Sequence, residues 1–88
     1  MEHFHGKIMH NGQVVVSDVS GTIIRDDPAI GLGAWAGSFS LPSGTHLDLR
    51  TMYQLVLDDG GQGEFMIKNV QVTSSGADVR FRGSGAPP

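Results

Sequence analysis

The chain has 88 residues, no cysteine, and 6 Lys and Arg against 9 Asp and Glu, which gives a formal net charge of −3. This length predicts one domain with a small core, and the absence of cysteine excludes disulfides and cysteine-based zinc sites as a source of stability. The acidic balance disfavours nucleic-acid binding, and neither a signal-peptide pattern nor an apolar run near the roughly 20 residues of a membrane helix is present, so we expect a cytoplasmic protein without a membrane partner.

The N-terminal part predicts a β-hairpin. Apolar and polar residues alternate over residues 3–9, which is the period of a strand, and a second apolar segment covers residues 13–24. Asn11-Gly12 between them is the strongest short hairpin signal, because both residues tolerate a positive φ angle. Gly21 indicates a bend or a bulge in the second segment. The two segments are therefore expected to be antiparallel neighbours.

A third strand is predicted over residues 35–41, after a loop indicated by Asp27-Pro28 and the two glycines that follow. Its odd-numbered positions carry the large residues Trp35, Phe39 and Leu41. Gly37 falls on the same face, where it leaves room for a neighbouring side chain. Pro42 and the next two residues end the strand.

Residues 47–57 keep their large apolar side chains at odd positions, as one long strand would, or as a strand preceded by a short turn near residues 50–52. The sequence DDGGQG then follows. It lacks the Lys-Ser/Thr of a phosphate-binding loop, and Asp58 and Asp59 would repel an anion. With Glu64 they could offer oxygen ligands to calcium, but their spacing is not that of an EF-hand. We interpret DDGGQG as a turn.

The last two strands are predicted over residues 64–73 and 78–82. Phe65 and Ile67 share one parity, whereas Val70 and Val72 have the other, so we expect a β-bulge near Lys68-Asn69. The residue triplet 74–76 reads Ser-Ser-Gly, which is typical of a turn. In the last strand the odd positions are expected to point inward.

These segments amount to six or seven strands, and closing such a sheet removes its exposed edges. We therefore predict an all-β fold, a small antiparallel barrel of SH3-like or OB-like size, with a flattened β-sandwich as the alternative. The expected core surrounds Trp35, Phe39, Tyr53 and Phe81. Residues 1–83 would form the domain, and residues 84–88, which are rich in Gly and Pro, a flexible tail.

The histidines are weak candidates for a metal site. His3 and His5 would point the same way from one strand, and His46 could be a third ligand. Lys7 extends the same face, however, and would repel a cation. We interpret the pair as an exposed polar face, and a metal-binding protein or metal-dependent enzyme that uses these histidines is the first alternative function.

No coherent catalytic group emerges from the sequence. His46 and Asp48 lie two residues apart beside Arg50, and Ser40 and Ser43 precede them, but such groupings are common by chance. A chain of this length has little room for both a core and a water-excluding pocket. We therefore expect no enzyme activity, no catalytic residue and no cofactor.

The positive indication of function is a set of apolar residues expected on the outer surface. Val56 and Met66 would point outward beside the DDGGQG turn, where they could lie side by side, and one valine of residues 14–16 must do the same. With Val15 they predict a surface that binds a protein partner or a second copy of the chain. Binding of single-stranded nucleic acid through Arg80, Arg82 and an exposed aromatic ring is the second alternative.

Overall fold

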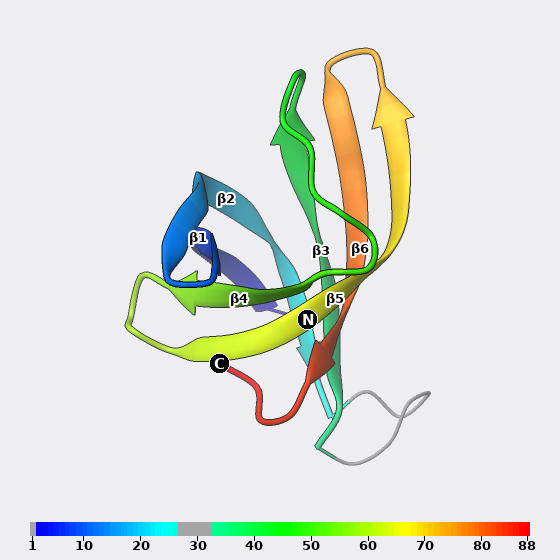
Figure 1. The fold of residues 1–88 in the computed structure, drawn as a ribbon. Helices are drawn as coiled ribbons and strands as arrows, with labels where there is room; N and C mark the ends of the chain where they lie inside the picture. Colours follow the sequence, from blue (N-terminus) through cyan, green and yellow to red (C-terminus); the bar gives the residue numbers. More distant parts are fainter. Residues whose placement is uncertain (1, 27–32) are drawn as a thin grey trace.

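The described part of the chain, residues 2–26 and 33–88 of a computed structural model, contains six β-strands (Figure 1). They are β1 (Glu2–His10), β2 (Gln13–Arg25), β3 (Trp35–Pro42), β4 (Met52–Leu57), β5 (Gln62–Thr73) and β6 (Gly76–Ser84). The strands close into an antiparallel barrel in the order β1-β2-β3-β6-β5-β4, and β4 pairs back to β1. The predicted small antiparallel barrel is confirmed. The turn expected at Asp27-Pro28 lies outside the described residues.

No helix in the described ranges is long and apolar enough to cross a membrane.

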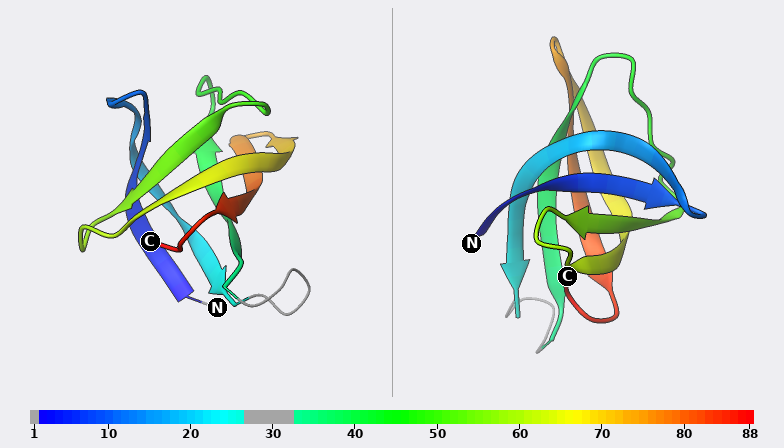
Figure 2. Two further views of the ribbon diagram at one scale, coloured as in Figure 1. Left: turned by 60° about the horizontal axis from the view of Figure 1, so that its bottom comes forward. Right: turned by 90° about the vertical axis from the view of Figure 1, so that its left-hand side faces the viewer.

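The β1–β2 hairpin turns at Asn11 and Gly12, whose φ angles are 51° and 78°, as the sequence predicts. The pairing register of β1 and β2 shifts twice, and β2 arches strongly around the barrel (Figure 2, right). No register shift occurs at Gly21. Instead, a Cβ placed on Gly21 would lie 1.9 Å from the carbonyl oxygen of Ser38, so this glycine lets β2 and β3 approach closely.

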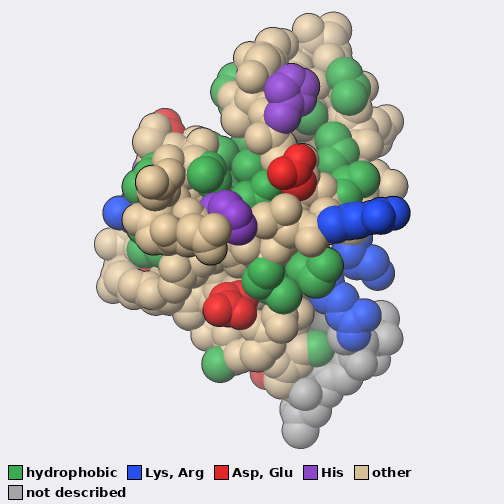
Figure 3. All heavy atoms as spheres, viewed as in Figure 1, with side chains coloured by type: hydrophobic (Ala, Val, Ile, Leu, Met, Phe, Trp, Pro, Cys, Tyr) green, Lys and Arg blue, Asp and Glu red, His purple; other side chains and the backbone are tan. Residues whose placement is uncertain are grey.

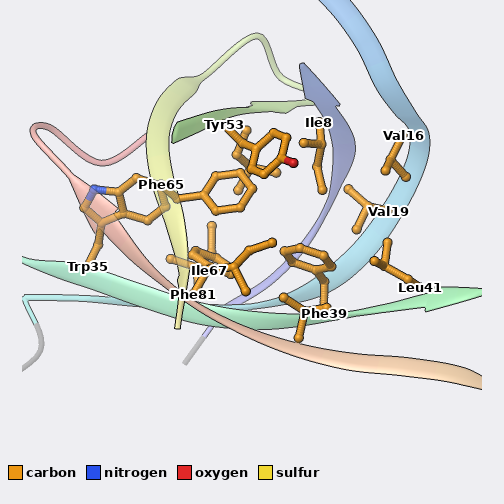
Figure 4. Packing of buried hydrophobic residues seen from close by; sticks show 13 residues of the cluster. Ile8, Val16, Val19, Trp35, Phe39, Leu41, Tyr53, Phe65, Ile67 and Phe81 are labelled. Atoms are coloured by element: carbon orange, nitrogen blue, oxygen red, sulfur yellow. The ribbon is translucent and has the colours of Figure 1, made fainter. Parts of the chain in front are cut away.

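The core is aromatic, and the rings point toward one another from different strands (Figure 4). The ring centroid of Phe81 lies 5.8 Å from that of Trp35, 5.6 Å from that of Phe39 and 4.9 Å from that of Phe65. The four residues expected at the centre are all buried. The room predicted at Gly37 is filled by Phe81, because a Cβ there would lie 2.7 Å from its ring. The buried apolar residues are Ile8, Val16, Val19, Ile23, Trp35, Phe39, Leu41, Tyr53, Leu55, Phe65, Ile67, Val79 and Phe81.

The segment before β4 is irregular, so the shorter of the two predicted arrangements is the observed one. A turn at Leu49 and Arg50 interrupts the alternation. Leu47 still packs against the core, but Leu49 is 53% exposed, and its expected inward position is wrong because the strand begins only at Met52. The backbone N–H of Asp48 donates to the hydroxyl of buried Tyr53 at 2.8 Å, which fixes this segment on the barrel.

The predicted bulge in β5 is confirmed, since the β5–β6 register shifts between Ile67 and Asn69. Among the described residues, β5 pairs beyond this point with β6 alone, and β3, β6 and β5 continue past the end of the barrel (Figure 1). We call this part the extension: residues 40–42 of β3, 76–79 of β6 and 69–73 of β5.

The C-terminal residues contact the barrel. The indole N–H of Trp35 donates to the carbonyl oxygen of Gly85 at 3.2 Å, and the guanidinium of Arg25 donates to that of Pro88. A Cβ on Gly63 would lie 2.9 Å from a ring carbon of Pro88, so the last residue rests on the start of β5.

Candidate functional site

Two of the three residues predicted to form an interface, Val56 and Met66, belong to different cross-strand pairs. Val56 is half-buried opposite Gln62, whereas Met66 is 40% exposed opposite Met52. Four positions along β4, about 13 Å, separate the two pairs, so Val56 and Met66 do not lie side by side. Val15 is 43% exposed at one of the register shifts of β2.

The extension leaves one edge of β5 open. Residues 68–73 are all exposed, and in the described ranges β4 pairs with β5 only over residues 62–66. From Asn69 to Thr73 the pairing with β6 on the other side is regular. Val70 is 38% and Val72 81% exposed, although both face the same side of the sheet as buried Val79. The sequence pattern placed these valines in phase but did not indicate that the barrel ends before them.

An apolar hollow of about 190 Å³ adjoins this edge. It lies between the inner face of the extension and the segment that leads to β4. Leu41, Leu47, Val70 and Val72 line it, and His46 borders it. Hydrophobic side chains are visible at the surface where the extension meets the barrel (Figure 3).

The outer face of the sheet carries a second, polar depression of about 820 Å³. We call it the outer groove. It crosses β2, β3, β6 and β5, and its lining residues are Thr22, Ile24, Ala36, Gly37, Ser38, Lys68, Asn69, Gln71, Arg80 and Phe81. The lining contains two cations and no carboxylate. Figure 3 shows Lys and Arg side chains gathered at the right-hand edge of that view, beside β5 and β6.

The strand registers arrange the polar residues of the outer groove in a row. Thr22 pairs with Ser38, Ser38 with Arg80, and Arg80 with Asn69, so one residue from each of four strands lies side by side. Arg82 follows two positions after Arg80 and therefore points the same way. The ion pairs found among the described residues involve His5 and Arg25 only, so Arg80 and Arg82 have no carboxylate partner within 4.0 Å there.

His5 is held between two carboxylates. Its Nδ1 lies 2.6 Å from Oδ2 of Asp58, and its Nε2 contacts Oδ1 of Asp18. Hydrogen bonds to both ring nitrogens favour the protonated imidazolium, so Asp58 first and then Asp18 raise the pKa of His5 above 6.5. The contact ties β1 to β2 and to the turn between β4 and β5.

The histidines proposed as metal ligands do not meet. Both nitrogens of His5 are occupied by aspartates, His3 lies beside it on β1, and His46 borders the apolar hollow. Across residues 2–26 and 33–88, no three His, Asp or Glu side chains are placed to share a metal ion.

The DDGGQG segment is a turn, as predicted. The N–H of Leu57 donates to the carbonyl oxygen of Gly61 at 2.8 Å, and Gly60 has a φ angle of 94°. Asp59 accepts the N–H of Gly61 at 2.8 Å, while Asp58 faces His5. The two carboxylates that were considered as calcium ligands therefore have separate partners.

In the described part of the chain, no side-chain hydrogen bond joins Ser40 or Ser43 to His46 or Asp48. The hydroxyl of Ser40 donates to Asp78 at 3.0 Å, and His46 and Asp48 lie outside any strand.

The aromatic rings do not offer the exposed stacking surface that the nucleic-acid alternative requires. All six are buried or half-buried, so none is exposed beside Arg80 and Arg82.

Comparison with protein-family models, with curated proteins and with solved structures found no match for this chain.

Proposed function

We propose that this chain is a non-catalytic self-assembly module, in which two copies pair along the open edge of β5. The observation that carries the proposal is the run of exposed, regularly spaced strand residues from Asn69 to Thr73, which has a neighbouring strand on one side only. Such an edge presents unpaired backbone N–H and C=O groups, and it is a template for a further strand.

The other long open edge is less suitable. Within the described ranges, residues 13–20 of β2 also have a neighbouring strand on one side only, but their register with β1 shifts twice. Bulges of this kind interrupt the regular spacing that a docking strand needs, and they are a common means of blocking edge-to-edge association. Residues 69–73 contain no bulge, no proline and no charged residue.

A second copy fits this edge because its sequence is nearly symmetric about Gln71. In an antiparallel pair with a two-fold axis at Gln71, Val70 faces Val72 of the other copy, and Asn69 faces Thr73. Each valine thus meets a valine on the inner face, next to the apolar hollow, and such cross-strand pairs contribute roughly 0.2–1 kcal/mol each. The two copies of Lys68 would be about 20 Å apart along the strands, which is beyond the Debye length of about 8 Å at physiological salt.

The pairing involves few residues, so the dimer is expected to be weak and dependent on concentration. Sedimentation velocity from about 10 µM to 1 mM tests it. We expect the average mass of the wild-type chain to rise toward that of a dimer. Val72→Lys places two like charges close together across the axis and should keep the protein monomeric.

Val15→Lys is the matched control, because it changes an exposed strand valine to the same charge on the bulged edge of β2. It should associate like the wild type. A wild-type protein that stays monomeric at every concentration contradicts self-assembly. Dimerisation that Val15→Lys abolishes and Val72→Lys leaves intact contradicts the assignment to β5.

A further inference from the structure

We propose that the outer groove binds a ligand that carries a chain of phosphate groups, with Lys68, Arg80 and the neighbouring Arg82 as its cationic contacts. This site lies on the outer face of the sheet and shares Asn69 and Gln71 with the open edge of β5, but its cations are present in each single copy of the chain. Its volume of about 820 Å³ lies in the range typical of small-molecule sites, roughly 300–1,000 Å³.

The charge of the groove opposes that of the whole protein. The chain has a net charge of −3 with six Lys and Arg residues, and three of these six lie on this one face. Two acidic residues lie two positions away in the registers: Asp78 from Arg80, where it accepts a hydrogen bond from Ser40, and Glu64 from the cross-strand partner of Arg82. Neither is within 4.0 Å of these guanidinium groups among the described residues. Cations without carboxylate partners produce a local positive potential that attracts an anion.

The polar uncharged residues of the groove add further donors. The hydroxyls of Thr22 and Ser38 share one hydrogen bond at 3.2 Å, which leaves the proton of one hydroxyl for a ligand, and Asn69 and Gln71 offer side-chain amides. Phosphate oxygens accept from guanidinium, ammonium, hydroxyl and amide groups alike, and charge-assisted bonds of this kind are the stronger ones. The row from Thr22 to Asn69 spans three strand spacings, about 14 Å, which suits several linked phosphates better than a single one.

The groove offers no surface for stacking. Among the described residues, Phe81 is the only aromatic one in its lining, and that ring is buried in the core. Bases bound to single-stranded sites gain much of their affinity from stacking on exposed aromatic rings. Recognition here must therefore rely on the phosphates, which favours a phosphorylated small molecule over single-stranded nucleic acid.

Titration of the ¹⁵N-labelled full chain with sodium tripolyphosphate at low salt tests the site by NMR. We expect saturable shifts that cluster on Thr22, Ser38, Asn69 and Arg80. Arg80→Gln should weaken binding about tenfold or more, as expected for loss of a hydrogen bond from a charged group. Its side chain is exposed, and the spectrum of the variant itself reports whether the fold is kept.

Lys7→Gln is the matched control, since it removes one positive charge on β1, away from the groove; it should change the affinity less than about twofold. Equal weakening by Lys7→Gln and Arg80→Gln, or shifts spread over the whole surface, would mean nonspecific attraction and overturn the proposal. Citrate binding as tightly as tripolyphosphate would overturn the preference for phosphate. Tighter binding of an oligo(dT) strand would assign the groove to nucleic acid instead.

Discussion

The barrel depends on two glycines that make space for its only tryptophan, and Gly83→Ala tests this directly. The indole of buried Trp35 lies against Gly83 of β6 and Gly63 of β5. A Cβ on Gly83 would lie 1.9 Å from Cε2 of Trp35 and 2.2 Å from Nε1. The indole cannot easily retreat, because its N–H is bonded to the carbonyl oxygen of Gly85 and its ring packs on Phe81.

The size of the effect follows from that overlap. Overpacking a core typically costs about 1–3 kcal/mol, and a contact of 1.9 Å demands the upper end, about 3 kcal/mol. A chain of 88 residues has a total stability of roughly 4–13 kcal/mol. The substitution should therefore remove a quarter or more of that stability, and it should lower Tm by about 12–24 °C, given 4–8 °C per kcal/mol for a domain of this size.

Urea and thermal unfolding followed by tryptophan fluorescence measure this, because Trp35 is the only tryptophan. Ser84→Ala is the control in the same strand and should change stability by less than about 0.5 kcal/mol. Gly63→Ala should fall between the two, because the nearest atom to a Cβ there is 2.8 Å away. The reasoning is refuted if Gly83→Ala unfolds at the same temperature as Ser84→Ala with an unchanged emission spectrum.

The remaining predictions concern His5 and Tyr53. Because the pKa of His5 is raised in the folded state, its stabilising contribution is complete below about pH 6.5 and is lost as the pH rises through the raised value. The Tm of the wild type should therefore fall relative to that of His5→Asn as the pH rises above about 6.5. Parallel Tm profiles for the two proteins would contradict a stabilising contact of His5 with Asp58 and Asp18. Tyr53→Phe removes the acceptor of the Asp48 N–H and should cost about 1 kcal/mol, with faster amide exchange at Asp48 than in the wild type.

Much of the fold follows from short-range chemistry that the sequence displays. Asn11-Gly12 specifies a hairpin because of its backbone preferences, and the change of parity between Ile67 and Val70 marks the bulge. Gly37 stands where the alternation calls for a large side chain, and the ring of Phe81 fills the space. The hairpin and the bulge follow from local rules alone, whereas at Gly37 the alternation predicts the space but not the residue that fills it.

The errors arose where tertiary contacts decide. Leu49 keeps the phase of a strand, yet a turn exposes it, and the N–H of the preceding Asp48 donates to the hydroxyl of Tyr53 instead of to a neighbouring strand. Val72 keeps the phase of the core, but the barrel has already ended at its position. Periodicity states which face a residue takes, and it does not state whether another strand covers that face.

The candidate surfaces were the least predictable part. The outer groove joins Thr22, Ser38, Arg80 and Asn69 from four strands, and only the registers bring them into one row. The aspartate pair around His5 likewise unites β1, β2 and a turn that is 53 residues away from His5 in the sequence. A single sequence gives no indication of such non-local neighbours.

The two proposals are coupled by geometry. A two-fold axis at Gln71 stands perpendicular to the sheet, so the outer faces of both copies would point the same way and their grooves would adjoin. The two copies of Arg80 would then be about 20 Å apart. That distance exceeds the Debye length at physiological salt but not the Debye length of roughly 30 Å at 0.01 M salt, so repulsion should weaken pairing mainly at low salt.

A phosphate chain neutralises these cations, and by linkage a ligand that favours the dimer must bind the dimer more tightly than the monomer. Ligand and self-pairing would therefore strengthen each other most where salt is lowest, whereas burial of the valines alone would give no such dependence.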